Sequence, residues 1–302
     1  MNILKRIKKN KYVRPVRLFI GYVVFLACYK IIRMLPWRVV IFMGRNFGRF
    51  VFYIIRYARK RTLDNLQAAF GSAKSRKEII KIAAGVYENF GMTAFEFLKA
   101  PHLSDKEFLS IVDYDDSTIG ESRRLAEEGK GVIVASAHMG NWEILALLGA
   151  HLKINMSVLV EPSTNPYINR LYQEMRGKNK LIDVTKEFVK IVPRLKAGET
   201  ICLLFDENAR ENGMLIDFFG RPASTYKGPA YFSIRTGAPI LCMYIIRAEN
   251  GTHRLVAGKT IRPEPTGDIN KDMEGILKLM NSDLEEVILK YPQQWNWLYK
   301  RW

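Results

Sequence analysis

The chain has 302 residues, enough for one or two domains, and its hydrophobic content of 48% is that of a folded protein. Its net charge of +17 is unevenly distributed along the sequence. Met1 to Leu63 holds sixteen of the 47 Lys and Arg residues and no acidic residue, and the rest of the chain holds the other 31 together with all 30 acidic residues. Because apolar residues interleave with the basic ones and no base-reading motif is present, nucleic acid is excluded as the expected partner. An anionic membrane surface is favoured instead.

Residues 1–62 are predicted to form helices that associate with a membrane. Leu18 to Tyr29 is an uninterrupted apolar run of twelve residues, shorter than the roughly 20 residues that a spanning helix needs. No small-residue cleavage site follows it, so a removed signal peptide is not expected. Basic residues flank the run on both sides, which favours a helix lying in the cytoplasmic interface over one that carries the rest of the chain across the bilayer.

The segment from Pro36 to Phe97 is predicted to be mainly helical. Pro36 to Tyr57 is apolar with an arginine every few residues, which indicates further membrane-facing helices; core helices whose arginines reach out to solvent are the alternative. Another helix is expected through Phe70, and apolar spacing predicts a helix over 74–97 with a turn signal at 89–91.

From Gly131 onward the strand and helix patterns alternate, which is typical of an α/β domain. Residues 63–302 are therefore predicted to form one such domain, with a mostly parallel or mixed central sheet and helices on both faces. Strands are expected at 132–137, 154–160, 181–184, 200–205, 239–246 and 253–258, and helices at 142–152, 166–177, 186–197, 227–236 and 270–290.

The strongest functional signal lies where the first of these strands ends. His138 follows an apolar strand, Gly140 permits a tight turn, Asn141 is a good helix N-cap, and Glu143 falls in the first helical turn. Open α/β sheets bind their ligands at this end of the strands. We predict that Glu143 contacts one imidazole nitrogen of His138 and makes the other a better base; a purely structural pair is the alternative.

The sequence SAHMGNWE at 136–143 resembles the His-x-x-x-x-Glu/Asp signature of membrane-associated acyltransferases. Other segments, in order along nearly the whole chain, are similar to those of the bacterial lipid A biosynthesis lauroyl/myristoyl acyltransferases. They are RTLDNLQAAFG, YENFGMTAFE, NPYINRLYQEMR, FDENARENGMLIDFFGRPASTYKGPA, RTGAPIL and YPQQWNWLYKRW. The FFG-x-x-A-x-T block and the terminal QWxW are the motifs most specific to this branch.

The resemblance implies an enzyme that moves a fatty acyl chain from acyl-acyl carrier protein to a hydroxyl of a lipid A precursor or similar membrane glycolipid. In the family the acceptor takes the chain on a hydroxyacyl group. The location implied is the cytoplasmic face of the bacterial inner membrane. No cofactor is expected, and no metal either, because no His-x-x-x-His or Cys-x-x-Cys pattern accompanies the site.

Acyl transfer from a thioester to a hydroxyl needs a base, donors for the oxyanion and a dry slot for the chain. His138 is the predicted general base and Glu143 the residue that orients it. The chain has no G-x-S-x-G nucleophile elbow, and no cysteine lies in a recognisable nucleophile setting. We therefore predict direct attack by the acceptor hydroxyl without an acyl-enzyme.

Two charged residues are predicted to bind substrate beside this pair. The resemblance places Arg176 near the active site, although an arginine that interacts with a helix C-terminus is equally compatible. Asp206 follows a predicted strand and resembles the start of the family's Asp-Gln/His-Asp block, which here continues with Glu207. Asp206 is expected to position Arg176 or Arg210, or to bind the acceptor sugar; structural capping is the alternative.

The segment from Phe218 to Thr225 is predicted to be a loop that lines the acyl slot or supplies backbone donors, with one of its two phenylalanines in the core. Thr225 is expected to cap the following helix. Lys227 falls in that helix's first turn, where a cation is locally unfavourable, so a phosphate or carboxylate partner is expected. The terminal tryptophans suit a membrane interface, with packing against the sheet as the alternative.

Two other functions remain open at this point. One is a phosphatidylinositol mannoside or glycerophospholipid acyltransferase that uses the same His138 and Glu143. The other is a non-catalytic membrane-binding homologue, and the intact pair argues against it.

Overall fold

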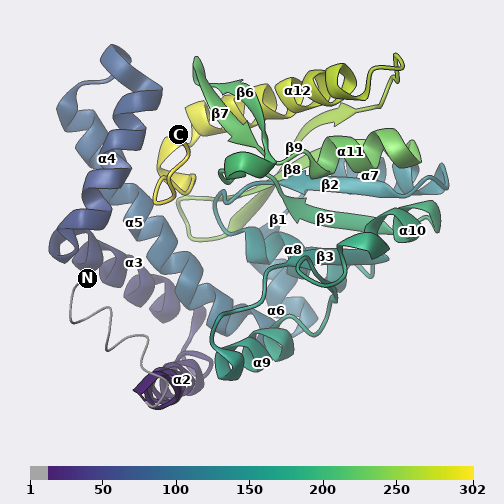
Figure 1. Ribbon diagram of the computed structural model, residues 1–302. Coiled ribbons are helices and arrows are strands. Elements are labelled where there is room, and N and C mark those ends of the chain that lie inside the picture. The colour runs from purple at the N-terminus through teal and green to yellow at the C-terminus, as the bar shows by residue number, and fades with distance from the viewer. Residues whose placement is uncertain (1–12) are drawn as a thin grey trace.

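The computed structural model describes residues 13–302, so the basic residues before Val13 lie outside the described part of the chain. A seven-stranded sheet forms the centre of the molecule in the order β1-β9-β8-β2-β5-β3-β4 (Figure 1). Within it β8 and β9 pair antiparallel and the other neighbours pair parallel. The predicted α/β class with a mixed central sheet is confirmed. The strands are β1 (Val112–Asp113), β2 (Val132–Ser136), β3 (Met156–Val160), β4 (Lys180–Asp183), β5 (Thr200–Leu204), β8 (Ile240–Arg247) and β9 (His253–Ile261).

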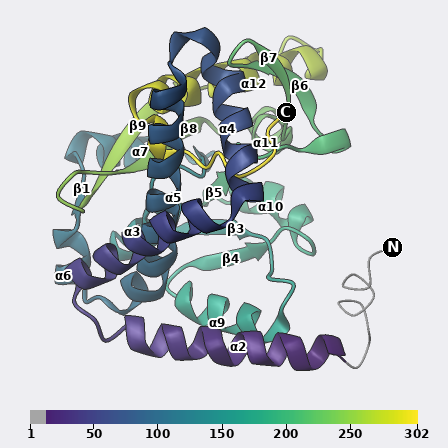
Figure 2. The same ribbon diagram turned by 90° about the vertical axis from the view of Figure 1, so that its left-hand side faces the viewer.

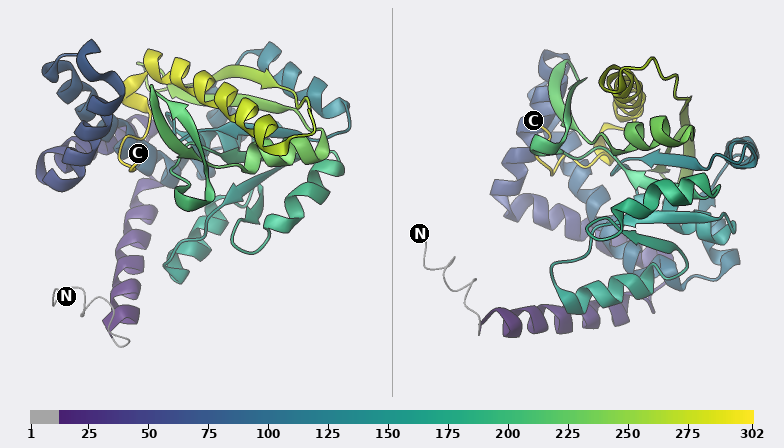
Figure 3. Two further views of the ribbon diagram at one scale, coloured as in Figure 1. Left: turned by 45° about the horizontal axis from the view of Figure 1, so that its top comes forward. Right: turned by 45° about the vertical axis from the view of Figure 1, so that its right-hand side comes forward.

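Helices cover both faces of the sheet (Figures 1 and 3). In β2, Ile133 and Ala135 belong to one hydrophobic core, and Val132 and Val134 belong to the other. The first core is closed by α10 (Ile191–Lys196), α11 (Gly228–Thr236) and α12 (Ile269–Lys290), and the second by α6 (Asp105–Ser110), α7 (Asp116–Glu127) and α8 (Trp142–His151). Because both faces of β2 are buried, its sequence is apolar from Val132 to Ala135 instead of alternating.

The described part of the chain begins with α2 (Val13–Ile32), α3 (Trp37–Ile54), α4 (Arg56–Phe70) and α5 (Arg76–Lys99), which α6 follows before the first strand. Helix α5 begins at a capping box formed by Ser75 and Glu78. The turn predicted at 89–91 is wrong, because α5 is continuous there. Gly91 serves close packing instead: a Cβ atom on it would lie 2.8 Å from the main-chain nitrogen of Gly48 in α3. The predicted domain boundary at residue 62 falls inside α4.

Helix α2 lies along the edge of the molecule beside α9 (Pro166–Met175) (Figure 2). Tyr29 and Ile32 belong to one buried hydrophobic cluster with Leu171 and Met175 of α9, whereas much of the rest of α2 faces outward. Over Pro15–Ile32 the helix is long and apolar enough, by length and composition, to cross a membrane, with a mean hydropathy of 1.7. Large apolar side chains are exposed on α2, on α3 and between them: Val16, Phe19, Ile20, Val23, Val24, Ile31, Met34, Val39, Phe42, Met43, Phe47, Phe50, Tyr53 and Ile54.

The six predicted strands are all present, and four of the five predicted helices after residue 140 are confirmed. The fifth, at 186–197, is a 3₁₀ turn, η3 (Phe188–Lys190), followed by α10. The predicted loop at 218–225 is wrong: it belongs to an antiparallel hairpin of β6 (Met214–Phe218) and β7 (Arg221–Thr225). Its two turn residues, Phe219 and Gly220, both have positive φ. That geometry usually selects Asn-Gly or Asp-Gly, so phenylalanine concealed the hairpin.

Candidate active site

The segment between β2 and α8 places His138 at the carboxyl end of β2, as predicted. Gly140 has a φ of +57°, and a Cβ atom there would collide with the carbonyl oxygen of Ile245 in β8. Asn141 caps α8, and its Oδ1 accepts from the main-chain N–H of Glu143 at 3.2 Å. The close approach to β8 therefore requires glycine, and the cap starts α8 directly behind the histidine.

Asp206 holds the imidazole ring of His138. It comes two residues after β5, the parallel neighbour of β2, so both residues lie at the same edge of the sheet. Its Oδ1 is 2.9 Å from Nδ1 of His138, and its Oδ2 accepts from the main-chain N–H of His138 at 2.9 Å and from the indole N–H of Trp295 at 2.8 Å. The carboxylate is buried and has three donors. Asp206 thus fixes the orientation and the tautomer of the ring.

The predicted contact between Glu143 and the His138 ring is wrong. The Glu143 carboxylate forms a two-point ion pair with Arg176, in which Nε donates to Oε2 at 3.0 Å and Nη2 donates to Oε1. The guanidinium also lies over the rings of Phe97 and Tyr172. Arg176 is therefore positioned by Glu143, not by Asp206 as expected.

The negative charges around His138 raise its pKa by more than burial lowers it. Burial alone would lower the pKa of the imidazole, but the charge and hydrogen bond of Asp206, followed by the charges of Glu207 and Glu143, raise that pKa above its ordinary value of 6.5. Burial of Asp206 acts in the opposite direction to its contacts with His138, and the pKa of this carboxyl is lowered. The resting pair is thus an imidazolium and a carboxylate over a wider pH range than an isolated histidine would give.

A pH profile follows from this shift. A general base works only when it is unprotonated, so kcat/KM is expected to rise with pH through a value above 6.5. Asp206→Asn removes the main charge that raises the pKa of His138. The pH at which kcat/KM rises is therefore expected to move about one to three units lower. Steady-state rates of the two proteins between pH 5 and 9 measure it. If kcat/KM rose at the same pH in both proteins, Asp206 would not be the residue that sets the pKa of His138.

The C-terminal segment forms one wall of the site, which the sequence did not reveal. The main-chain N–H of Asn296 donates to the carbonyl of His138 at 3.0 Å, and the ring of Tyr299 lies edge-on to the imidazole. Asn65 of α4 anchors this segment by donating to the carbonyl of Trp297 at 2.8 Å. Trp295 and Trp297 are buried. For these two residues the predicted membrane interface is therefore wrong, and the alternative, packing inside the protein, is correct. The terminal QWxW motif, one of the two most specific to this branch, is the feature of the sequence that could have pointed to this role.

Trp295→Phe is expected to lower kcat about tenfold or more, because a buried carboxylate loses one charge-assisted hydrogen bond and holds the imidazole less firmly. Trp297→Phe is the matched control. Its indole donates to the carbonyl of Pro292 at 2.7 Å and does not touch Asp206. Both variants lose a buried hydrogen bond and some stability, but only Trp295→Phe should lose kcat. Equal losses of kcat would assign Trp295 to packing alone.

A buried polar network supports the loop from behind. Glu96 of α5 is fully buried and pairs with two guanidinium nitrogens of Arg247 and with the side-chain amide of Asn141. Asn89 and Thr93, on the same helix, donate to the carbonyl of Gly140. Burial alone would raise the pKa of Glu96, but Arg247 and then His253 outweigh it and lower the pKa to about 2. This network fixes the backbone that carries His138.

The other predicted substrate-binding residues are dispersed. Thr225 ends β7 and accepts from Arg301 at 2.9 Å, and it does not cap α11 as expected. Lys227 is exposed at the N-cap of α11 and lines the cavity described below. Arg210 is exposed in η4 (Arg210–Asn212) and is not among the residues that line that cavity. Phe218 is fully buried, as expected for one of the two phenylalanines.

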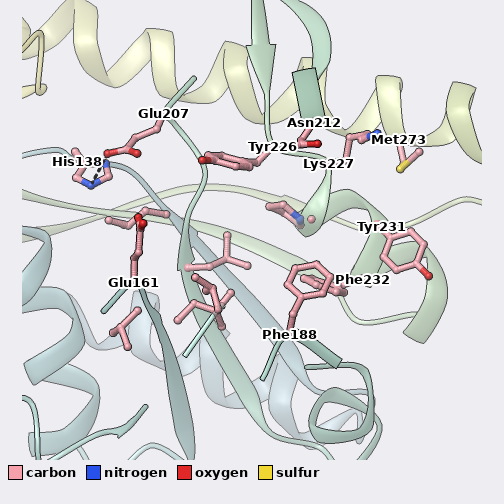
Figure 4. A pocket seen from close by; sticks show the side chains of 17 residues that line it. His138, Glu161, Phe188, Glu207, Asn212, Tyr226, Lys227, Tyr231, Phe232 and Met273 are labelled. Atoms are coloured by element: carbon pink, nitrogen blue, oxygen red, sulfur yellow. Dashed lines mark ion pairs between the residues drawn. The ribbon is translucent and has the colours of Figure 1, made fainter. Parts of the chain in front are cut away.

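A cavity of about 620 Å³ runs from His138 between the sheet and α11 (Figure 4). His138, Glu161 and Glu207 lie at one end, and aromatic side chains lie at the other. Apolar side chains make up most of its wall: Leu159, Val160, Val184, Phe188, Leu203, Leu204, Phe232 and Met273. A smaller cavity of about 100 Å³ includes Arg176 and shares Val160 and Glu161 with the first. The cavity thus joins the His138 imidazole to a long apolar slot.

Comparison with known proteins gives two groups of relatives. The family model described as bacterial lipid A biosynthesis acyltransferase matches residues 6–302. A phosphatidylinositol mannoside acyltransferase of Mycolicibacterium smegmatis is 23% identical over 231 residues, which cover 74% of this chain and 72% of that protein. The lipid A biosynthesis palmitoleoyltransferase of Escherichia coli is 24% identical over 275 residues (88% and 86%), and the lauroyltransferase of the same organism is 22% identical over 274 residues (88% and 86%).

Proposed function

Because the chain belongs to the bacterial lipid A biosynthesis acyltransferase family, and is therefore an acyltransferase of the lipid A or phosphatidylinositol mannoside type, we propose the following reaction. The enzyme transfers a fatty acyl chain from acyl-acyl carrier protein to a hydroxyl of a lipid A precursor or similar membrane glycolipid. The observation that carries this proposal is the His138–Asp206 pair at the end of a long apolar cavity.

His138 acts as the general base in this proposal. A carboxylate only accepts hydrogen bonds, so Nδ1 carries the proton that faces Asp206 and the neutral ring presents a free lone pair at Nε2. The acceptor hydroxyl gives its proton to Nε2 as its oxygen attacks the thioester carbonyl. When the tetrahedral intermediate collapses, the carbon–sulfur bond breaks and Nε2 returns the proton to the departing sulfur, which leaves an ester and a free carrier thiol.

Direct attack without an acyl-enzyme is supported by the state of the cysteines. Cys202 and Cys242 are buried, and burial raises the pKa of the Cys202 thiol to about 12 and raises that of Cys242 as well. Neither forms a thiolate near neutral pH, and Cys28 lies on α2. Acid quenching during turnover, followed by mass spectrometry of the intact protein, tests the step: a covalently acylated enzyme would overturn it.

The apolar cavity is the proposed acyl slot. Its wall of aliphatic and aromatic side chains shields the acyl chain from water, and the end that His138 lines places a thioester carbonyl next to the base. Glu143 contributes through its charge and through its hold on Arg176, for which contact with substrate stays a prediction. The acidic carrier and a phosphorylated acceptor are attracted by the basic excess of the N-terminal segment.

We propose that the enzyme works at the cytoplasmic face of the inner membrane, with α2 and α3 in the lipid interface. The exposed apolar side chains of α2 and α3, interleaved with arginines, support this placement. Protease added to intact spheroplasts should leave the C-terminus uncut and should cut it after lysis. Cleavage in intact spheroplasts would place the catalytic part outside.

One incubation tests the reaction itself. Purified enzyme is mixed with acyl-acyl carrier protein and an isotope-labelled lipid A precursor, and the lipid is read by mass spectrometry. The expected product is heavier by one acyl group. Acylation of a phosphatidylinositol mannoside or a glycerophospholipid, with none of the lipid A precursor, would establish the alternative, which the similarity to the mycobacterial enzyme favours.

A further inference from the structure

The proposed transfer places a negative charge on the carbonyl oxygen of the thioester, and this oxyanion needs a hydrogen-bond donor close to His138. Few side chains of the cavity wall can supply one. Glu161 and Glu207 only accept hydrogen bonds when they are ionised, and Nε2 of His138 takes the proton of the acceptor. Of the described residues that line the cavity, the other side chains that carry a donor are Asn212, Tyr226, Lys227 and Tyr231.

Tyr226 differs from the other three in where its donor lies. In Figure 4 its hydroxyl oxygen points along the cavity toward His138 and Glu207, whereas the other three side chains lie further from His138. The charges of Glu207 and then Glu161 act on the phenol, so both carboxylates are close to it. The Tyr226 hydroxyl therefore faces the part of the cavity in which an oxyanion beside Nε2 of His138 would form.

The phenol of Tyr226 is a donor that cannot become a base near neutral pH. Burial, followed by the charges of Glu207 and Glu161, raises its pKa above the ordinary value of 10.0, and Arg210 lowers it by less. The hydroxyl therefore keeps its hydrogen and can donate it. Within the described part of the chain this hydroxyl has no hydrogen-bond partner, so its hydrogen is free for a ligand.

The backbone that carries Tyr226 is held from inside the protein. Arg301 is buried and donates to the carbonyl oxygen of Ser224 at 2.6 Å and to Oγ1 of Thr225 at 2.9 Å. These two residues directly precede Tyr226, and Lys227, which follows it, is the N-cap of α11. A donor on a fixed backbone needs little reorganisation when charge develops in front of it, which is the condition under which it stabilises an oxyanion most.

The charge of Glu207 is compensated when the oxyanion forms. In that step Nε2 of His138 gains a proton and becomes positive, and Oε1 of Glu207 lies 3.5 Å from it. Tyr299 is hydrogen-bonded to the same carboxylate. Glu161, the second acid at this end, is exposed, so solvent weakens its field. Neither acid therefore prevents a neutral donor from stabilising the oxyanion.

We propose that Tyr226 is a second catalytic residue, whose hydroxyl donates a hydrogen bond to the carbonyl oxygen of the thioester as that oxygen becomes an oxyanion. The phenol keeps its hydrogen throughout, so the proton still passes from the acceptor to Nε2 of His138 and from there to the departing sulfur. The inference rests on the proposed acyl transfer, and it adds the group that stabilises the charge on the reacting carbonyl.

The first test is Tyr226→Phe, which removes the donor and keeps the ring. Both proteins are assayed with acyl-acyl carrier protein and the lipid A precursor, or with phosphatidylinositol mannoside if that lipid is the one acylated. Loss of one oxyanion donor is expected to lower kcat about 10²- to 10³-fold. The KM for the acyl carrier should stay nearly unchanged, because the hydrogen bond is strong only in the transition state.

A second acyl donor separates a hydrogen bond to the oxyanion from a defect of packing. In an acyl dithioester a sulfur atom replaces the carbonyl oxygen, and sulfur accepts hydrogen bonds weakly. Tyr226→Phe should therefore lose much less kcat with the dithioester-loaded carrier than with the ordinary one, because the hydrogen bond that it removes is already weak there. A general structural defect would lower both rates by the same factor.

Tyr114→Phe is the matched control. It removes a phenol hydroxyl from a partly buried residue that packs against the second hydrophobic core and lines neither the large cavity nor the small one beside Arg176. Its rates with both acyl donors should equal those of wild type. Thermal unfolding, followed by circular dichroism, establishes that both variants are folded at the temperature of the assay.

Two results would overturn the inference while leaving acyl transfer intact. They are a wild-type kcat for Tyr226→Phe with the ordinary thioester, and equal losses of kcat with the thioester and the dithioester. Absence of transfer to either lipid by the folded wild-type enzyme would reject the proposed function, and this inference with it.

Discussion

His138→Ala is expected to lower acyl transfer about 10²- to 10⁴-fold, the range that a positioned general base contributes. In the proposed step Nε2 of the imidazole takes the proton. Asp206 lies on the other side of the ring, where its Oδ1 meets Nδ1 and its Oδ2 accepts from the main-chain N–H of His138 and from Trp295. The measurement is kcat for the acylated product, read by mass spectrometry, together with membrane binding, which should be unchanged.

His151→Ala is the matched control for that variant. His151 ends α8, the helix that begins behind His138, and its ring stacks on Phe108 and contacts Asp105. His151→Ala removes an imidazole from a residue that does not line the cavity, so transfer should continue at a temperature where both variants are folded. Transfer at the wild-type rate by His138→Ala would reject the site.

Arg247→Met is expected to destabilise the protein by about 3–5 kcal/mol, the usual cost of leaving a buried charge without its partner. Glu96 is fully buried, and Arg247 is the cation that supplies two hydrogen bonds to it. The double variant Glu96→Gln/Arg247→Met should be less destabilised than Arg247→Met alone, because no charge is then buried. Urea unfolding, followed by circular dichroism, gives the free energy of unfolding for each protein.

Arg254→Met supplies the comparison, because Arg254, on the neighbouring strand β9, forms an exposed pair with Asp113. Its loss is expected to cost less than about 1 kcal/mol. Equal costs for the two arginines would show that the buried pair is not a special support. Glu96 also sets a pH signature: its folded pKa is about 2 against 4.5 for an unperturbed glutamate, so its contribution to stability is complete above pH 4.5 and is lost as the pH falls toward 2. Glu96→Gln should remove that part of the acid sensitivity.

Local patterns were sufficient for the sheet and for the position of His138 at the end of β2. The strand at 132–136 has β-branched and small residues throughout, and the Gly140–Asn141 pair after it marks a turn and a helix start. The side chain that contacts His138 was not predictable in the same way. Asp206 lies 68 residues further on, and it meets His138 only because β5 is the neighbour of β2, which depends on the order of the strands. Without that order, the nearby Glu143 was the natural but wrong choice.

The same reason applies to the wall formed by the C-terminal segment. Trp295 reaches Asp206 and Tyr299 reaches His138 because α4 and α5 hold the last residues against the loop. No spacing in the sequence records these contacts. Their composition, aromatic rings beside basic residues, is shared by membrane interfaces and by packed termini. The hairpin of β6 and β7 was missed for a local reason, the positive φ of Phe219.

Helix α5 connects two parts of the molecule that have been described separately. Gly91 and Phe95 pack against α3, which carries exposed aromatic side chains, whereas Asn89, Thr93 and Glu96 hold the loop of the base. One continuous helix therefore connects the exposed apolar side chains of α3 to the loop that carries His138, with no break between them. If α3 binds a bilayer, the imidazole of His138 is held at a fixed distance from the lipid tails. The depth of a hydroxyl in the headgroup layer, as well as its chemistry, would then determine whether it is acylated.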